Sequence, residues 1–322
     1  MERINELINK IKKLGYTIHS TGYRNEEDAE KGIYTRRDWV LPRENYKLKN
    51  TPFFYDSGND FIHFTSLDSL FSILNSGHLR LYNLLNMDDK LELEYARKAL
   101  LLKTNSDEKI KEQLYSFSMC SSKEILEEEP KKKKHLLWKL HGKDGNGVII
   151  RLKRMNELTT WRSYYLTKCF YDLEVFSAIK ELNEITNQEI LENKLACFIK
   201  LPIYDFEKEI RLVFDMANSE KHFDTNTLTT TYPKIYPDKL NKSDKISYFQ
   251  LPLYNFYKDN DKAAYPLLSD FVGEKYETPK MSITEIILGY RYNDNDLKNL
   301  KERINTFDST INVKMSDLKQ YY

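Results

Sequence analysis

The sequence is poor in cysteine, the residue that cross-links small domains and binds zinc, and it has few glycines and prolines. Its 322 residues include three cysteines, ten glycines and nine prolines. Cys120, Cys169 and Cys197 are too few and too scattered for a disulfide framework or a cysteine-rich zinc site. We therefore expect buried thiols in a reducing compartment. No run of about 18 apolar residues is present, which predicts no transmembrane helix. Residues 1–16 lack the continuous apolar core of a signal peptide, so we expect a soluble, cytoplasmic protein without membrane contact.

An excess of charge of one sign is also missing. Fifty Lys and Arg stand against 49 Asp and Glu, a net charge of +1. This balance excludes a general electrostatic attraction to nucleic acid or to an anionic membrane. The run EEEPKKKK at 127–134 is typical of a solvated loop rather than of a nucleic-acid contact. With 23 Tyr and 16 Phe the chain can bury a large core, and its composition is not that of a disordered protein.

The N-terminal segment is predicted to be separate from the rest. Ile4, Leu7 and Ile11 follow the spacing of one helix face, and Gly15 is a plausible end for that helix. From about residue 20 to 60 the chain is polar and irregular. We interpret residues 1–58 as a helix followed by an extended arm, and residues 59–322 as a single α+β domain.

Strand and helix signals are mixed along residues 59–322, without a regular βαβα order. This pattern predicts an α+β domain with a central mixed or antiparallel sheet and flanking helices. Strands are predicted at 61–65, 79–82, 115–120, 147–152, 162–171, 206–214, 245–251, 283–289 and 311–315. Helices are predicted from a cap at Ser66 to Gly77, at 88–103, around 136–140, over about 173–196 and near 294–305.

The sequence contains none of the strong generic motifs. It lacks a GxxxxGK[ST] phosphate loop, an HExxH helix and a GxSxG elbow. The run GKDGNG at 142–147 precedes a strand and opens no helix, so it is a turn rather than a dinucleotide fingerprint. Candidates for chemistry are therefore polar residues on strands patterned for burial.

His63 is the first candidate. It shares a strand face with Thr65, and the strand leads through Ser66 into a helix, so its end could line a cleft. A histidine among apolar neighbours is also a common satisfied core residue. Ser116 and Ser118 form a second candidate, because small hydroxyls on a strand face allow a ligand to approach closely. Taken alone, the two serines are better explained by tight packing.

Three ionisable residues, Glu207, Glu209 and Arg211, alternate along the predicted strand 206–214. Such a face is either a solvated salt-bridge ladder or an active site, since clustered carboxylates in clefts are common functional signals. Arg211 would favour the ionised form of the neighbouring carboxylate. The acids Asp88, Asp89, Glu92 and Glu94 could bind a divalent cation, but acids at a helix start need no function to explain them.

Six short segments, in order, resemble a bacterial family described only as a domain of unknown function, family 2971. The resemblance covers about residues 60–316, and its departures are Asp88, where the family usually has Asn, and His141, where it has Tyr. The segments are HFTSL with ILNSGHLRL, MDDKLE, YSFS, LWKLH with GVII, EKEIRLV, and ITEIILG. The family name implies no activity.

The strand–helix unit from His63 onward is also similar to that of ADP-ribosyltransferases. That resemblance implies an ADP-ribosyltransferase-like core in which Glu209 is the catalytic glutamate and Glu207 completes a Glu-x-Glu pair. The NAD-binding positions would be His63, Thr65, Ser66, Ser116, Ser118 and Arg211. The chain would then consume NAD and modify a macromolecule, as a toxin or anti-phage effector with a possible regulatory protein partner.

In this scheme His63, the serines and Glu209 must line one pocket, with His63 and Glu209 on the same face of the sheet. Two other hypotheses stay open. One is a non-catalytic module in which Trp138 and His141 recognise a ligand or a protein. The other is a metal-dependent nuclease using Asp88, Asp89, Glu92 and Glu209.

Overall fold

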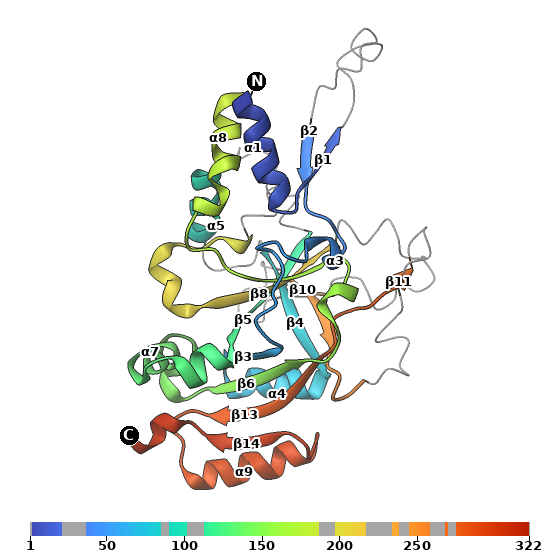
Figure 1. Cartoon of the computed structure of the whole chain (residues 1–322). Coiled ribbons are helices and arrows are strands. Elements are labelled where there is room, and N and C mark those ends of the chain that lie inside the picture. The colour runs from blue at the N-terminus through green and yellow to red at the C-terminus, as the bar shows by residue number, and fades with distance from the viewer. Residues whose placement is uncertain are drawn as a thin grey trace.

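The computed structural model describes residues 2–20, 37–84, 90–101, 113–186, 197–216, 234–237, 245–257, 268–269 and 275–321. Through these residues runs a sheet of ten strands with helices beside it and at both ends (Figure 1). The strands of this sheet are β3 (Asp60–Thr65), β4 (His78–Asn83), β5 (Leu114–Ser121), β6 (Val148–Arg154), β7 (Tyr164–Lys168), β8 (Glu209–Asp215), β9 (Lys234–Pro237), β10 (Lys245–Pro252), β13 (Met281–Leu288) and β14 (Asn312–Met315). Shorter strands pair separately, β1 (Thr17–Ser20) with β2 (Arg37–Val40) and β11 (Leu268–Ser269) with β12 (Lys275–Tyr276).

The α-helices flank this sheet and connect its strands. They are α1 (Glu2–Lys13), α3 (Asn45–Leu48), α4 (Leu67–Ser76), α5 (Lys90–Leu100), α7 (Lys131–His141), α8 (Ser177–Thr186) and α9 (Asp294–Asn305). The order of the sheet is β14-β13-β6-β3-β5-β4-β10-β9, and β8 pairs with both β5 and β7. The pair β13–β14 is parallel, whereas β6, β3, β5 and β8 pair antiparallel. The prediction of an α+β fold around a mixed sheet is confirmed.

Strand β5 is the branch point of the sheet. Along one edge it pairs with β8 from Leu114 to Cys120. Along its other edge β5 pairs with two strands, one at each end. Strand β3 pairs with Cys120 and Ser121, and β4 pairs with Tyr115 and Ser116. The strands β3 and β4 therefore part at the middle of β5, and α4 connects them in sequence.

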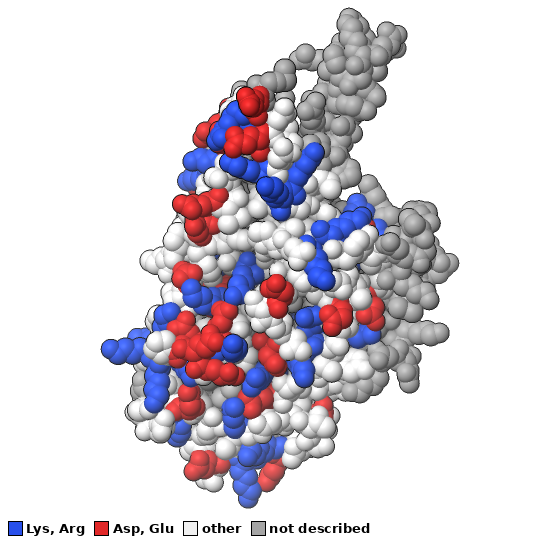
Figure 2. All heavy atoms as spheres, viewed as in Figure 1, with Lys and Arg blue, Asp and Glu red and all other residues white. Residues whose placement is uncertain are grey.

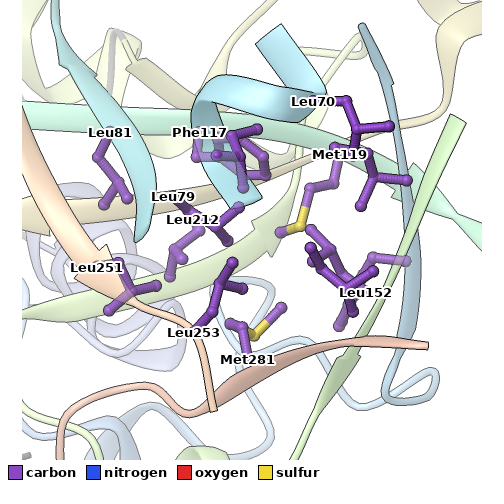
Figure 3. Close-up of a cluster of buried hydrophobic side chains, with 14 of the residues drawn as sticks. Leu70, Leu79, Leu81, Phe117, Met119, Leu152, Leu212, Leu251, Leu253 and Met281 are labelled. Atoms are coloured by element: carbon purple, nitrogen blue, oxygen red, sulfur yellow. The ribbon is translucent and has the colours of Figure 1, made fainter. Parts of the chain in front are cut away.

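Helix α4 begins and ends as the sequence predicts. The Ser66 hydroxyl accepts a hydrogen bond from the amide of Ser69, and Gly77 closes the helix with a φ of 68°. The buried face of the helix packs over one side of the branch point. Figure 3 shows Leu70 of α4 beside Phe117 and Met119 of β5, in the largest apolar cluster.

Two predicted segments differ from the structure. The charged stretch after β5 is no loop, because residues Lys123–Glu128 form a π-helical turn and α7 starts at Lys131, directly after Pro130. The predicted strand 206–214 begins only at Glu209. Lys208 has a left-handed φ of 48°, so Glu207 ends a 3₁₀ helix, Pro202–Glu207, instead of sharing the strand.

The N-terminal segment packs into the rest of the chain. Leu7 and Ile11 of α1 are buried in one cluster with Phe53, Phe198 and Val213. Figure 1 shows α1, α5 and α8 side by side at one end of the molecule. The apolar core therefore crosses the predicted boundary at residue 58. No helix among the described residues is long and apolar enough to cross a membrane.

Candidate functional site

The register of β3, β5 and β8 decides which candidate side chains meet. Directly paired residues in an antiparallel sheet project from the same face. Ile62 pairs with Cys120, and Cys120 pairs with Glu209. Ser118 pairs with Arg211. The two serines of β5, Cys120, Glu209 and Arg211 therefore occupy one face, here called the serine face.

His63 leaves β3 on the opposite face. It pairs with Ile150, and its ring packs on Phe117 with centroids 4.4 Å apart, in the apolar cluster beneath α4. The expectation that His63 and Glu209 share one face is therefore wrong. The reason is the period of two along a strand: Ile62, not His63, pairs across to Cys120. Thr65 shares the face of His63, and Ser66 is occupied as the cap of α4.

The imidazole of His63 nevertheless reaches the middle of β5. Its Nδ1 lies 2.9 Å from the carbonyl oxygen of Ser118, at the edge of β5 where β3 and β4 part. A carbonyl oxygen only accepts, so Nδ1 carries the proton and Nε2 keeps its lone pair. Burial lowers the pKa of His63 to about 4, so the ring is neutral near pH 7.

Ser118 is exposed although β5 lies inside a ten-stranded sheet. On the same face Ser116, Glu209 and Arg211 are buried, and Cys120 is half-buried. The serine face is therefore most open at Ser118. An exposed small hydroxyl on a central strand is a suitable floor for a ligand.

Beside this opening four buried charged residues form an ionic cluster: Lys200, Glu207, Glu209 and Arg211. Lys200 Nζ lies 2.5 Å from Glu207 Oε2 and 2.6 Å from Glu209 Oε2. Arg211 donates from Nε to Glu209 Oε1 at 2.6 Å and from Nη1 to the carbonyl of Cys197 at 2.6 Å. Two positive and two negative side chains neutralise one another inside the fold.

His141 at the end of α7 closes the cluster toward solvent. Its Nε2 lies 3.0 Å from Glu207 Oε1, and its side chain is 44% exposed. Burial alone would raise the pKa of Glu207, but hydrogen bonds from His141 and Lys200 bring it below its usual value. For Glu209, burial is likewise outweighed by the charges of Arg211 and Lys200, which lower its pKa to about 2. Both carboxylates are ionised near pH 7.

Two residues at the cluster, Lys200 and Tyr171, are not predicted from the sequence. The hydroxyl oxygen of Tyr171 accepts a hydrogen bond from the amide of Glu209 at 3.0 Å. Tyr171 ends an aromatic run, and Lys200 follows a short apolar run, so neither interrupts a periodic pattern. Both residues lie near Glu209 because of the path that the chain takes after β7. A backbone bridge between Phe170 and Ile199 holds these two segments side by side. No local sequence signal marks them.

The described residues give little support to the binding-module hypothesis or to the nuclease hypothesis. Trp138 is 2% exposed and packs edge-on against Phe64, so it does not recognise a partner at the surface. Asp88 and Asp89 lie outside the described residues, and so does the side chain of Glu92. The described His, Cys, Asp and Glu residues include no group suited to a metal ion.

On the face drawn in Figure 2, acidic and basic side chains are interspersed over the described residues, in keeping with the net charge of +1. Comparison with known proteins adds no relative: no family model, no curated protein and no solved structure matches the chain. The two resemblances stay predictions from the segments that carry them.

Proposed function

We propose that this chain is an NAD-consuming transferase that passes ADP-ribose to a macromolecule, with the serine face as the floor of its NAD site. The observation that carries the proposal is Ser118. It is exposed in the middle of a central strand, pairs with Arg211 of the ionic cluster, and its carbonyl accepts the hydrogen bond of His63. The resemblance selects three strands, and the central one, β5, pairs with both of the others, β3 and β8.

In this reaction the bond between nicotinamide and the ribose C1′ breaks, and its electron pair leaves with nicotinamide. The ribosyl carbon becomes positively charged until a nucleophile on the acceptor bonds to it and loses a proton. Ser118 leaves room for a flat ring, and the ionised Glu209, which lies on the same face, stabilises the developing cation.

Because His63 and Glu209 lie on opposite faces, His63 takes no part in the proposed NAD site, although the resemblance places it there. It holds the backbone of β5 through the Ser118 carbonyl, and the proposal depends on the serine face and Glu209. Both oxygens of Glu209 are bonded, Oε1 to Arg211 and Oε2 to Lys200 and, at 3.3 Å, to Arg211. For Glu209 to meet the sugar, Lys200 turns toward Glu207 alone and the long contact from Arg211 Nη2 opens. A role as a toxin or anti-phage effector, held by a regulatory partner, belongs to this proposal.

The test uses the full chain, labelled NAD and a cell lysate as the source of acceptors. Calorimetry measures NAD binding, and nicotinamide release and label transfer measure the reaction. Ser118→Leu fills the floor at an exposed position, so we expect NAD binding and turnover to fall at least tenfold at an unchanged melting temperature. Ser309→Leu, at an exposed serine in the turn after α9, is the matched control.

The proposal fails if the parent chain does not bind NAD, or if Ser118→Leu binds and consumes NAD as the parent does. NAD turnover without added metal favours the transferase, whereas a nucleic-acid-cleaving activity that a chelator abolishes, without NAD turnover, favours the nuclease hypothesis. Binding of NAD without nicotinamide release removes the transferase and leaves a binding module.

A further inference from the structure

A cavity of about 470 Å³ opens next to the ionic cluster, on the other side of Tyr171. One wall comes from the segment 52–57 before β3, and the other from the segment 168–175 after β7. Asp205 of the 3₁₀ helix stands at its border. The volume lies within the range of small-molecule sites, about 300–1,000 Å³. The proposed NAD site uses none of these residues.

The walls of the cavity are aromatic and held in place. Phe54, Tyr55, Phe170 and Tyr171 line it. The ring of Phe170 packs edge-on against Phe176 with centroids 4.9 Å apart, and Tyr171 is tied through its hydroxyl to the Glu209 amide. Phe54, Phe170 and Tyr171 are only half-buried, so parts of their rings are available to a ligand. Ring faces carry partial negative charge and attract cations.

The charged groups of the cavity favour a cation as well. Three carboxylates line it, from Asp56, Asp172 and Asp205, against one ammonium, that of Lys168. Lys168 is engaged by Glu124 at 2.6 Å, and Asp205 accepts from Lys208 at 2.7 Å.

Asp172 accepts from the amide of Glu174 at 2.9 Å, which positions the loop. Asp56 is exposed, and its bond within the described residues is a long one, 3.5 Å, from the Ser57 hydroxyl. The carboxylate of Asp56 is therefore available for a ligand.

We propose that this cavity binds a guanidinium group. A guanidinium is planar, stacks on aromatic rings and pairs its N–H groups with a carboxylate, which matches half-buried rings beside Asp56. An ammonium could pair with the carboxylate but would use the ring surface less well. The guanidinium comes either from a free small molecule or from an arginine side chain of a polypeptide. The proposal is independent of NAD consumption, because it concerns binding in the absence of NAD.

Calorimetry on the full chain without NAD tests it, with three probes: agmatine, N-acetyl-arginine amide and its neutral isostere N-acetyl-citrulline amide. We expect both guanidinium probes to bind saturably and the citrulline compound to bind at least tenfold more weakly. A short arginine peptide with neutral flanks separates the sources. Tighter binding than agmatine indicates a polypeptide ligand, and weaker binding indicates a free small molecule.

Asp56→Asn should weaken binding of N-acetyl-arginine amide at least tenfold while leaving the melting temperature unchanged, since Asp56 is exposed. The matched control, Asp294→Asn, removes the same charge from the start of α9 and should leave binding at the parental level. The proposal fails if citrulline binds as tightly as arginine, if the two variants weaken binding equally, or if no probe saturates. NAD turnover plays no part in these outcomes, so this result and that of the NAD assay can fail separately.

Discussion

The guanidinium of Arg211 binds the carboxylate of Glu209, which lies two residues earlier on the same strand. Its Nε lies 2.6 Å from Oε1 and its Nη2 lies 3.3 Å from Oε2, so the guanidinium holds both carboxylate oxygens. Arg211 is 1% exposed and Glu209 is 5% exposed. A buried pair of this kind fixes the carboxylate in its ionised form, and it also makes the carboxylate part of the core.

Glu209→Gln is therefore expected to lower stability as well as any activity. The amide cannot neutralise Lys200 and Arg211, so one buried positive charge is left in excess. Loss of one partner of a buried ion pair costs about 3–5 kcal/mol in free energy of unfolding. Urea denaturation of the purified variant measures this loss. A variant as stable as the parent would show that Glu209 is solvated in solution.

The same burial complicates the functional test of Glu209. If the carboxylate stabilises a ribosyl cation, its removal should lower the rate of nicotinamide release by about 10²–10³. That rate must be measured at a temperature where denaturation curves show the variant to be folded. A folded Glu209→Gln protein that consumes NAD at the parental rate removes Glu209 from the proposed mechanism.

His63 should make stability depend on pH in a defined window. Its pKa is lowered from 6.5 to about 4 in the folded chain. Between these values the unfolded chain binds a proton that the folded chain does not. The free energy of unfolding therefore falls as the pH falls from 6.5 toward 4, by up to about 3 kcal/mol.

His63→Gln can still donate to the Ser118 carbonyl but does not titrate, so it should flatten the pH dependence between pH 6.5 and 4. The fall that Glu209 causes lies lower, between 4.5 and about 2, because its pKa is depressed from 4.5. Urea midpoints at half-unit steps of pH separate the two windows. An unchanged slope above pH 4.5 in His63→Gln would place the titrating group elsewhere.

Much of the fold could be predicted from periodicity and caps. The helix from Ser66 to Gly77 and the helix 294–305 follow from local signals, a capping hydroxyl, a glycine and spaced apolar residues. The predicted start of β8 is wrong because EKEIR alternates in sequence as a strand does. The left-handed turn at Lys208 breaks that alternation, and nothing in the residue type announces it.

The candidate site was predictable only in part. The serine face and the Glu209–Arg211 pair follow from alternation within single strands. Whether His63 joins them depends on the register between β3 and β5, and a shift of one residue changes the face. The participation of Lys200 depends on contacts between segments far apart in sequence, which one chain's pattern does not encode locally.

The resemblance to ADP-ribosyltransferases implies that Ser66 binds NAD, whereas in the structure Ser66 caps α4. Its Oγ accepts from the Ser69 amide at 3.1 Å. Ser66→Ala should lower the free energy of unfolding by about 1 kcal/mol, and Ser66→Asp should restore it, because aspartate also caps and carries a favourable charge. If Ser66→Ala is as stable as the parent but loses NAD binding, the hydroxyl serves a ligand and not the helix.

Lys200 and Glu207 should be energetically coupled, because Lys200 bridges Glu207 and Glu209 inside the fold. In Lys200→Met the buried carboxylates of Glu207 and Glu209 lose their shared ammonium. Glu209 then keeps its bond to Arg211, and Glu207 keeps its bond to His141. We expect a loss of about 3–5 kcal/mol in free energy of unfolding. Adding Glu207→Gln to Lys200→Met removes one of the stranded charges, so the double variant should be less destabilised than the sum of the single ones. The difference should be about 1–3 kcal/mol.

The nearby pair Lys208–Asp205 is the control for this double-mutant cycle. Its atoms are as close, 2.7 Å, but its side chains are 34% and 55% exposed. Water screens such a pair, so Lys208→Met and Asp205→Asn should add within about 0.5 kcal/mol. Equal coupling in the two cycles would mean that Lys200 and Glu207 are as solvated as the control pair. In that case the cluster would be an open, water-filled site, and Glu209 would reach a substrate without any movement of Lys200.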